Sequence, residues 1–158
     1  MKTSKFLFQK VLLQTKRFIL PALVGAGVLA GAVLGQGGET VPYKSKVSGH
    51  LTFTPSGGFT IEETGIGTHL GTFTLVGAAD AKGILWFALT AASGDQVLGV
   101  LADAAPDLSW VELVIYDGTG RFEGATGNIT GIVTMDWSTL AYTAVGTGSI
   151  TTVGSNKK

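Results

Sequence analysis

Residues 127–138 read GNITGIVTMDWS, and this stretch decides the fold. The odd positions from Ile129 to Trp137 hold Ile, Gly, Val, Met and Trp, whereas the even positions from Asn128 to Asp136 hold Asn, Thr, Ile, Thr and Asp. A period of two is typical of a β-strand with one buried face. We therefore expect a strand here, with the odd set, including Met135, facing a core.

Seven other segments share this composition of Thr, Val, Ile and aromatic residues. The predicted strands are 44–54, 59–63, 68–77, 83–91, 96–101, 109–117, 127–138 and 141–152. Turn sequences such as PSGG at 55–58 and SGD at 93–95 separate them. Because no amphipathic helical pattern of useful length is present, the sequence predicts an all-β protein.

Glycine favours closure of these strands into a barrel. Of the 24 glycines, 20 follow residue 35, and several lie inside predicted strands, such as Gly49, Gly131 and Gly146. Glycine inside a strand costs packing and backbone entropy, but sharply coiled strands need positions without a Cβ. We therefore expect a single eight-stranded antiparallel barrel over residues 43–153, which leaves no exposed sheet edge. A two-sheet sandwich is the alternative, and an outer-membrane barrel is less favoured because several strands are short.

The first 35 residues differ in character from the rest. They carry five of the eleven Lys and Arg residues and no acidic residue, and the seventeen residues 18–34 are uncharged. This order predicts an N-terminal signal peptide over 1–35, cleaved after Ala32 or after Gly35. A short linker at 36–42 and a polar tail at 154–158 would flank the barrel domain, and the protein would be secreted or reside in the cell envelope. The alternative is an uncleaved leader that anchors the chain in the membrane.

Composition excludes several classes of function. The chain has no cysteine, which removes thiolate nucleophiles, cysteine-bound zinc and disulfides. Residues 36–158 contain six cations and eleven acidic residues, a net charge of −5. A nucleic-acid partner is not expected, because phosphate binding depends on Lys and Arg.

Residues 118–127 read GTGRFEGATG, which invites comparison with nucleotide-binding loops. The dinucleotide fingerprint needs glycine at position 123, where Glu123 stands, and a helix after it, whereas a Thr-rich strand pattern resumes by Gly127. The segment is therefore interpreted as a tight turn between strands.

The same ten residues resemble the GTG-[RK]-F-x-x-A-x-G signature of the allene oxide cyclase and dirigent barrel superfamily. Residues 67–71 (GTHLG) and 146–150 (GTGSI) resemble segments of small exported bacterial proteins of that type, so the resemblance spans residues 42–152. It implies a calycin-like barrel, trimeric in the plant members, whose cavity guides a hydrophobic or phenolic substrate without a cofactor. The matching positions are turn and packing residues, so the resemblance transfers no catalytic set.

The predicted fourth and sixth strands are apolar on both faces. Leu85, Phe87 and Leu89 alternate with Ile84, Trp86 and Ala88, and residues 110–116 follow a similar pattern. An apolar outer face needs cover from another molecule. We therefore predict self-association through these two strands.

Ionisable residues on the predicted strands supply few candidates for chemistry. Glu112 shares a face with Trp110, Val114 and Tyr116, where desolvation would raise its pKa and suit it to general acid–base work. The alternative is a solvated Glu112, or one paired with Arg121. An enzyme would need a polar side chain directed into the cavity, and the candidates are Glu112, Tyr116 and Asp136. The histidines His50 and His69 lack metal-ligand spacing, so no metal site is predicted.

Three classes of function stay open. The first is a binding module, whose cavity for a small hydrophobic ligand would be lined by Phe73, Phe87, Met135, Trp137 and Tyr142. The second is a cofactor-independent cyclase or dirigent-like enzyme acting on a hydrophobic or phenolic substrate. The third is a structural or interaction protein of the envelope with a filled barrel. Because no catalytic cluster stands out, the sequence favours binding or a structural role.

Overall fold

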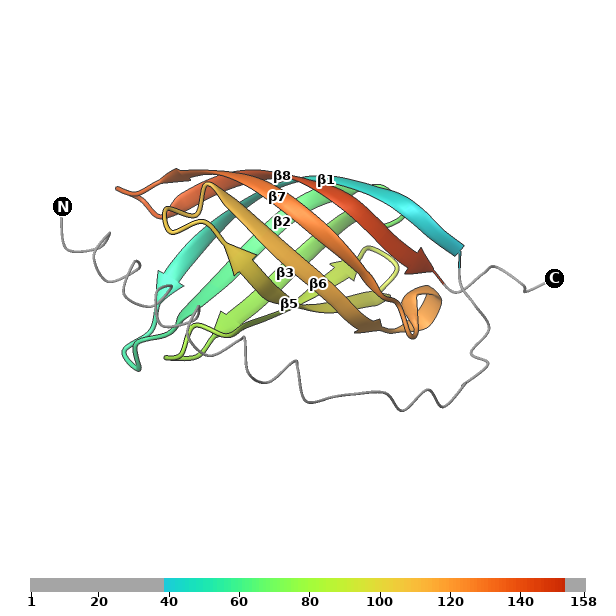
Figure 1. The fold of residues 1–158 in the computed structure, drawn as a ribbon, viewed down its shortest axis with the longest axis horizontal. Helices are drawn as coiled ribbons and strands as arrows, with labels where there is room; N and C mark the ends of the chain where they lie inside the picture. The colour runs from blue at the N-terminus through green and yellow to red at the C-terminus, as the bar shows by residue number, and fades with distance from the viewer. Residues whose placement is uncertain (1–38, 153–158) are drawn as a thin grey trace.

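The structure is a computed structural model and describes residues 39–152. Its strands are β1 (Glu39–Phe53), β2 (Phe59–Gly67), β3 (Gly71–Ala79), β4 (Leu85–Ala91), β5 (Gln96–Ala104), β6 (Trp110–Gly118), β7 (Gly127–Asp136) and β8 (Ala141–Thr152). Each strand is antiparallel to the next, and β8 pairs with β1 to close the barrel (Figure 1). The predicted all-β, eight-stranded barrel is confirmed, and the sandwich alternative is wrong. The predicted leader and polar tail lie outside the described residues.

The strand β1 closes the barrel because it pairs along its length with two partners. Its residues 39–50 pair with β8, and residues 45–53 pair with β2. Part of the predicted linker, from residue 39 on, is therefore strand. Pairing with the long β8 thus extends β1 to Glu39, before the predicted start of the strand at residue 44.

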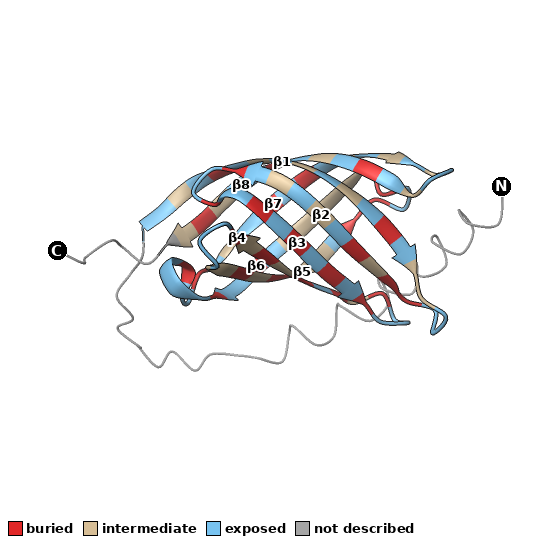
Figure 2. Cartoon of the chain, turned by 180° about the vertical axis from the view of Figure 1, so that it is seen from behind, coloured by how far each residue is buried: buried red, intermediate tan, exposed pale blue. Residues whose placement is uncertain are grey.

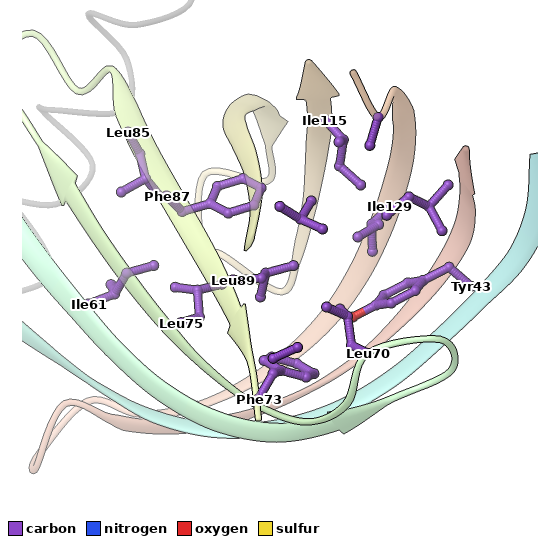
Figure 3. Close-up of a cluster of buried hydrophobic side chains, with 14 of the residues drawn as sticks. Tyr43, Ile61, Leu70, Phe73, Leu75, Leu85, Phe87, Leu89, Ile115 and Ile129 are labelled. Carbon is purple, nitrogen blue, oxygen red and sulfur yellow. The ribbon is translucent and has the colours of Figure 1, made fainter. Parts of the chain in front are cut away.

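Buried and exposed residues alternate along the strands (Figure 2), and the buried hydrophobic residues form one core. In β4, for example, Leu85, Phe87 and Leu89 are buried, whereas Trp86 is exposed. Figure 3 shows Phe73 of β3 and Phe87 of β4 among the aliphatic side chains that fill the interior. The barrel therefore has an apolar inside, as the alternation predicted.

A short helical turn closes one end of the barrel. The 3₁₀ helix η1 (Gly120–Phe122) joins β6 to β7, and the side chain of Phe122 is fully buried. Gly120 and Gly124 have φ angles of +60° and +67°, which residues with a Cβ rarely adopt. The glycine-rich segment is thus a structural turn that lets Phe122 pack against the core. Within residues 39–152, no helix is long and apolar enough to cross a membrane.

The outer face of β3 to β6 carries an apolar patch formed by Val76, Trp86, Val114 and Tyr116. These side chains are 59, 47, 37 and 51% exposed, respectively. Trp86 pairs with Val100, which in turn pairs with Val114, and Val76 lies on β3 next to β4, so the patch runs across four neighbouring strands. Self-association through this face stays a prediction, because the structure contains a single chain.

Candidate functional site

The barrel contains a cavity of about 110 Å³ that is partly open to solvent. All eight strands contribute to its wall, and most of the lining side chains are aliphatic or aromatic. The polar side chains of the lining are Tyr43, Ser45, Glu63 and Tyr142. Protein interiors are normally packed as densely as organic crystals, so a void of this size is an unusual feature of a core.

Burial differs between the η1 end of the barrel and the β7–β8 hairpin. At the η1 end, Val97, Phe122 and Ile150 are completely buried. Toward the β7–β8 hairpin, the lining residues Val133 and Met135 are only half-buried. The less tightly sealed part of the cavity wall therefore lies on the side of this hairpin.

The central feature of the cavity is a hydrogen bond between Glu63 and Tyr142. The Tyr142 hydroxyl donates to Glu63 Oε1 at 2.5 Å. Glu63 faces inward because it continues the buried face of β2 that begins with Phe59 and Ile61. The pair thus places one carboxyl group in an otherwise apolar interior.

Gly49 makes this contact possible. It lies on β1 between the two partners, opposite Glu63 on β2 and opposite Tyr142 on β8. A Cβ at Gly49 would lie 2.7 Å from Glu63 Cγ and 2.9 Å from Tyr142 Cζ, closer than such atoms approach. The two side chains therefore meet across β1 because residue 49 has no side chain.

Burial changes the acidity of the groups in the cavity. Desolvation raises the pKa of Glu63, and the hydrogen bond from Tyr142 offsets part of this rise. Desolvation and the neighbouring Glu63 also raise the pKa of Tyr142. Burial raises the pKa of Tyr43 to about 12, although its hydrogen bond with Ser45 acts in the opposite direction. Both tyrosines are therefore uncharged at neutral pH, and Glu63 holds its proton more tightly than a solvated glutamate does.

The structure brings together four of the five aromatic and sulfur-containing residues predicted to bind a ligand. Phe73, Phe87, Met135 and Tyr142 all line the cavity. Trp137 instead follows the end of β7, where it packs against the core without lining the cavity. Because β7 ends at Asp136, Trp137 does not follow the alternation of inward and outward side chains that the sequence predicted.

The three residues suggested for catalysis lie away from the cavity. Tyr116 is exposed on the outer face of β6, and Glu112 is half-buried on the same face. Arg121, the suggested partner of Glu112, instead forms an ion pair with Asp95, at 3.1 Å from Nε to Oδ2. Neither Glu112 nor Tyr116 can therefore reach a molecule inside the barrel.

Asp136, the third of these residues, is exposed and stabilises the β7–β8 turn. The Ser138 hydroxyl and the backbone N–H of Ser138 both donate to Asp136 Oδ1, at 2.6 and 2.8 Å. These hydrogen bonds, with others from Thr139, lower the pKa of Asp136. The carboxylate therefore has a local structural role in the turn.

The two histidines lie at opposite ends of the barrel. His50 Nε2 is 2.9 Å from the carbonyl oxygen of Thr139 in the β7–β8 turn, and His69 Nε2 is 3.2 Å from that of Pro42 in β1. Across residues 39–152, no cluster of three or more metal-ligating side chains is found.

Glu63 is the functional candidate that the sequence analysis did not single out. The sequence does indicate that Glu63 shares the inward face of its strand, because Phe59, Ile61 and Glu63 occupy alternate positions of one predicted strand. The meeting of Glu63 with Tyr142 across Gly49 depends on the register of three strands, which alternation alone does not provide.

Comparison with known protein families gives no match, and no curated protein matches the chain. Among solved structures, the barrel is similar to that of the pterocarpan synthase dirigent protein GePTS1, with a TM-score of 0.54 and 13% sequence identity. The similarity covers 78% of this chain and 94% of that chain. At this identity it concerns the fold alone. Together with the closed strand order, it establishes that this chain has a dirigent-like eight-stranded antiparallel β-barrel fold.

Proposed function

We propose that the protein is exported and binds one small, mainly apolar molecule inside its barrel. The observation that carries this proposal is the cavity of about 110 Å³ with its apolar wall. A void in a core forfeits packing contacts and so lowers stability. A bound molecule would restore these contacts, as in other concave apolar sites.

The volume limits the size of the ligand. An engineered apolar cavity of roughly 150 Å³ in another protein stays dry and binds benzene. The cavity here is of the same order, so it suits a molecule about the size of a single ring.

Toluene is a suitable probe, because it has one ring and no polar group. We expect saturable chemical-shift changes at the methyl groups of Leu51, Leu75 and Leu89, which line the cavity. The methyl groups of Val76 and Val145 on the outer face serve as internal controls, since both are exposed. Methyl-detected NMR during a toluene titration tests this. Shifts confined to the outer valines, or no saturable shift at all, would contradict binding inside the barrel.

A second function, enzymatic catalysis, is favoured by one observation. Glu63 projects into the cavity with a raised pKa, which is a property of general acids and bases. The similarity in fold to a protein described as a synthase is compatible with this role. Native mass spectrometry of the protein purified from its own host distinguishes the two functions. A co-purifying molecule that is returned unchanged supports binding. A molecule that the wild-type protein converts and the Glu63→Gln variant does not convert supports catalysis.

Export is proposed from the sequence of the first 35 residues, in which a basic segment precedes an uncharged one. Cell fractionation combined with N-terminal sequencing tests it. A new N-terminus after Ala32 or Gly35 in the exported fraction is the expected result. A cytoplasmic protein that retains Met1 would contradict export.

A further inference from the structure

We infer that Glu63 and Tyr142 bind the polar group of the ligand, so that the cavity selects a compact neutral molecule bearing a hydroxyl group over both a hydrocarbon and a carboxylate. This inference rests on the proposed binding function and adds the chemical class of the ligand.

One oxygen of the Glu63 carboxyl group lacks a partner among the described residues. Glu63 Oε1 accepts the hydrogen bond from Tyr142, whereas Glu63 Oε2 has no hydrogen-bond partner among residues 39–152. Glu63 is half-buried, and a polar atom that lies against an apolar wall without a partner is costly. A ligand hydroxyl can supply the missing partner, because it both donates and accepts. A hydrocarbon cannot.

The cavity lining disfavours a negatively charged ligand. Among residues 39–152, no Lys, Arg or His side chain lines the cavity, so this part of the chain presents no cation to it. A carboxylate that entered would lose its hydration and meet no opposite charge, which is strongly unfavourable. It would also meet the acidic group of Glu63. The cavity therefore excludes anions even where their size fits.

The titratable groups that face Glu63 are few. Tyr43 on β1 and Tyr142 on β8 line the same cavity, and the other strands contribute no ionisable side chain to its wall. Burial keeps both tyrosines protonated and favours the protonated form of Glu63. A protonated carboxyl group can donate or accept a hydrogen bond, which fits a neutral hydroxyl.

Three probes that share the same seven carbon atoms test the inference. They are toluene, benzyl alcohol and benzoate, whose affinities are measured by NMR or calorimetry at about pH 6. In the wild-type protein we expect benzyl alcohol to bind more tightly than toluene, and benzoate not to displace either. Benzyl alcohol also controls for size, since it has a polar group on the same carbon as benzoate. Displacement of toluene by benzoate, or benzyl alcohol binding no more tightly than toluene, would overturn the inference.

Two variants locate the effect at Glu63. In Glu63→Leu, the ratio of benzyl alcohol affinity to toluene affinity should fall about threefold to tenfold, the effect of one hydrogen bond. In Glu63→Gln, which keeps a donor and an acceptor, the ratio should stay close to that of the wild type. An unchanged ratio in Glu63→Leu would overturn the inference while leaving cavity binding intact. Failure of toluene to bind any variant or the wild type would refute the proposed function itself.

A pH series on the wild-type protein gives a test that does not depend on whether Glu63→Leu folds. As pH rises through the pKa of Glu63, the ionised carboxylate should weaken toluene binding. It should weaken benzyl alcohol binding less, because the alcohol donates a charge-assisted hydrogen bond to the carboxylate. The affinity ratio should therefore rise with pH in the wild type and stay constant in Glu63→Gln. A constant ratio in the wild type would contradict the assignment.

Discussion

Filling the cavity from β8 should stabilise the protein and abolish ligand binding at the same time. Ala144 lies on the inner face of β8, between Val47 of β1 and Val133 of β7, and all three line the cavity. The substitution Ala144→Leu adds three carbon atoms to a void of about 110 Å³. Burial of each carbon contributes about 0.8 kcal/mol, so we expect the free energy of unfolding to rise by up to about 2 kcal/mol.

Urea unfolding followed by circular dichroism measures the stability of Ala144→Leu, and a toluene titration measures its affinity. We expect toluene affinity to fall at least about tenfold, because the added side chain occupies the space of the ligand. The matched control is Ala141→Leu, which adds the same atoms on the exposed face of the same strand. Its unfolding free energy should change by less than about 0.5 kcal/mol, with toluene affinity unchanged.

Two results with Ala144→Leu would refute this reasoning. A loss of about 1–3 kcal/mol of stability is typical of overpacking and would mean that no free space is present at this position. A stabilised variant that still binds toluene with wild-type affinity would place the toluene site elsewhere.

Three further predictions concern Gly49, Glu63 and the outer patch. Gly49→Ala should lower the free energy of unfolding by about 1–3 kcal/mol through overpacking, as measured in urea. The control Gly131→Ala should cost less, since the closest contact of its Cβ is a side-chain methyl group of Val111 at 3.0 Å; equal losses would contradict the close approach at Gly49. The folded state raises the pKa of Glu63 from its ordinary value of 4.5, so this group's contribution to stability is complete below that pH and is lost as pH rises through the raised pKa. Glu63→Gln should lack this decrease in the free energy of unfolding and be more stable than the wild type at high pH. The same change of unfolding free energy with pH in both proteins between pH 4 and 8 would disprove this. Trp86→Arg should disperse the self-associated form in analytical ultracentrifugation, and a wild-type protein that sediments as a monomer at micromolar concentration would argue against that interface.

Much of the fold could be predicted from the sequence because the core is built by simple alternation. The clean pattern of 127–136 gives the inward face of β7 directly. Alternation is less informative where glycine replaces the inward residue. The predicted second strand ended at Glu63, whereas β2 continues to Gly67, since Gly65 and Gly67 pair with β1 and leave space for the rings of Phe73 and Tyr43.

Other features depend on contacts between distant segments. In β5, register shifts after Leu98 and after Leu101 interrupt the ladder with β6, and a regular two-residue period cannot predict them. The start of β1 at Glu39 depends on its pairing with Thr152 at the other end of the described chain. The Glu63–Tyr142 contact likewise depends on strand register across Gly49. The sequence therefore indicates the barrel, but the position of the carboxyl group within it needs the structure.

A crystal structure of the protein soaked in bromobenzene tests the central claim most directly. Bromobenzene has the shape of toluene, and the bromine atom can be located by its anomalous scattering. We predict a bromine peak inside the barrel, among Leu75, Leu89 and Met135, with the β-strand framework unchanged. Bromine peaks found only on the outer face, or an interior filled by the protein's own side chains, would contradict the claim that this barrel holds a ligand cavity.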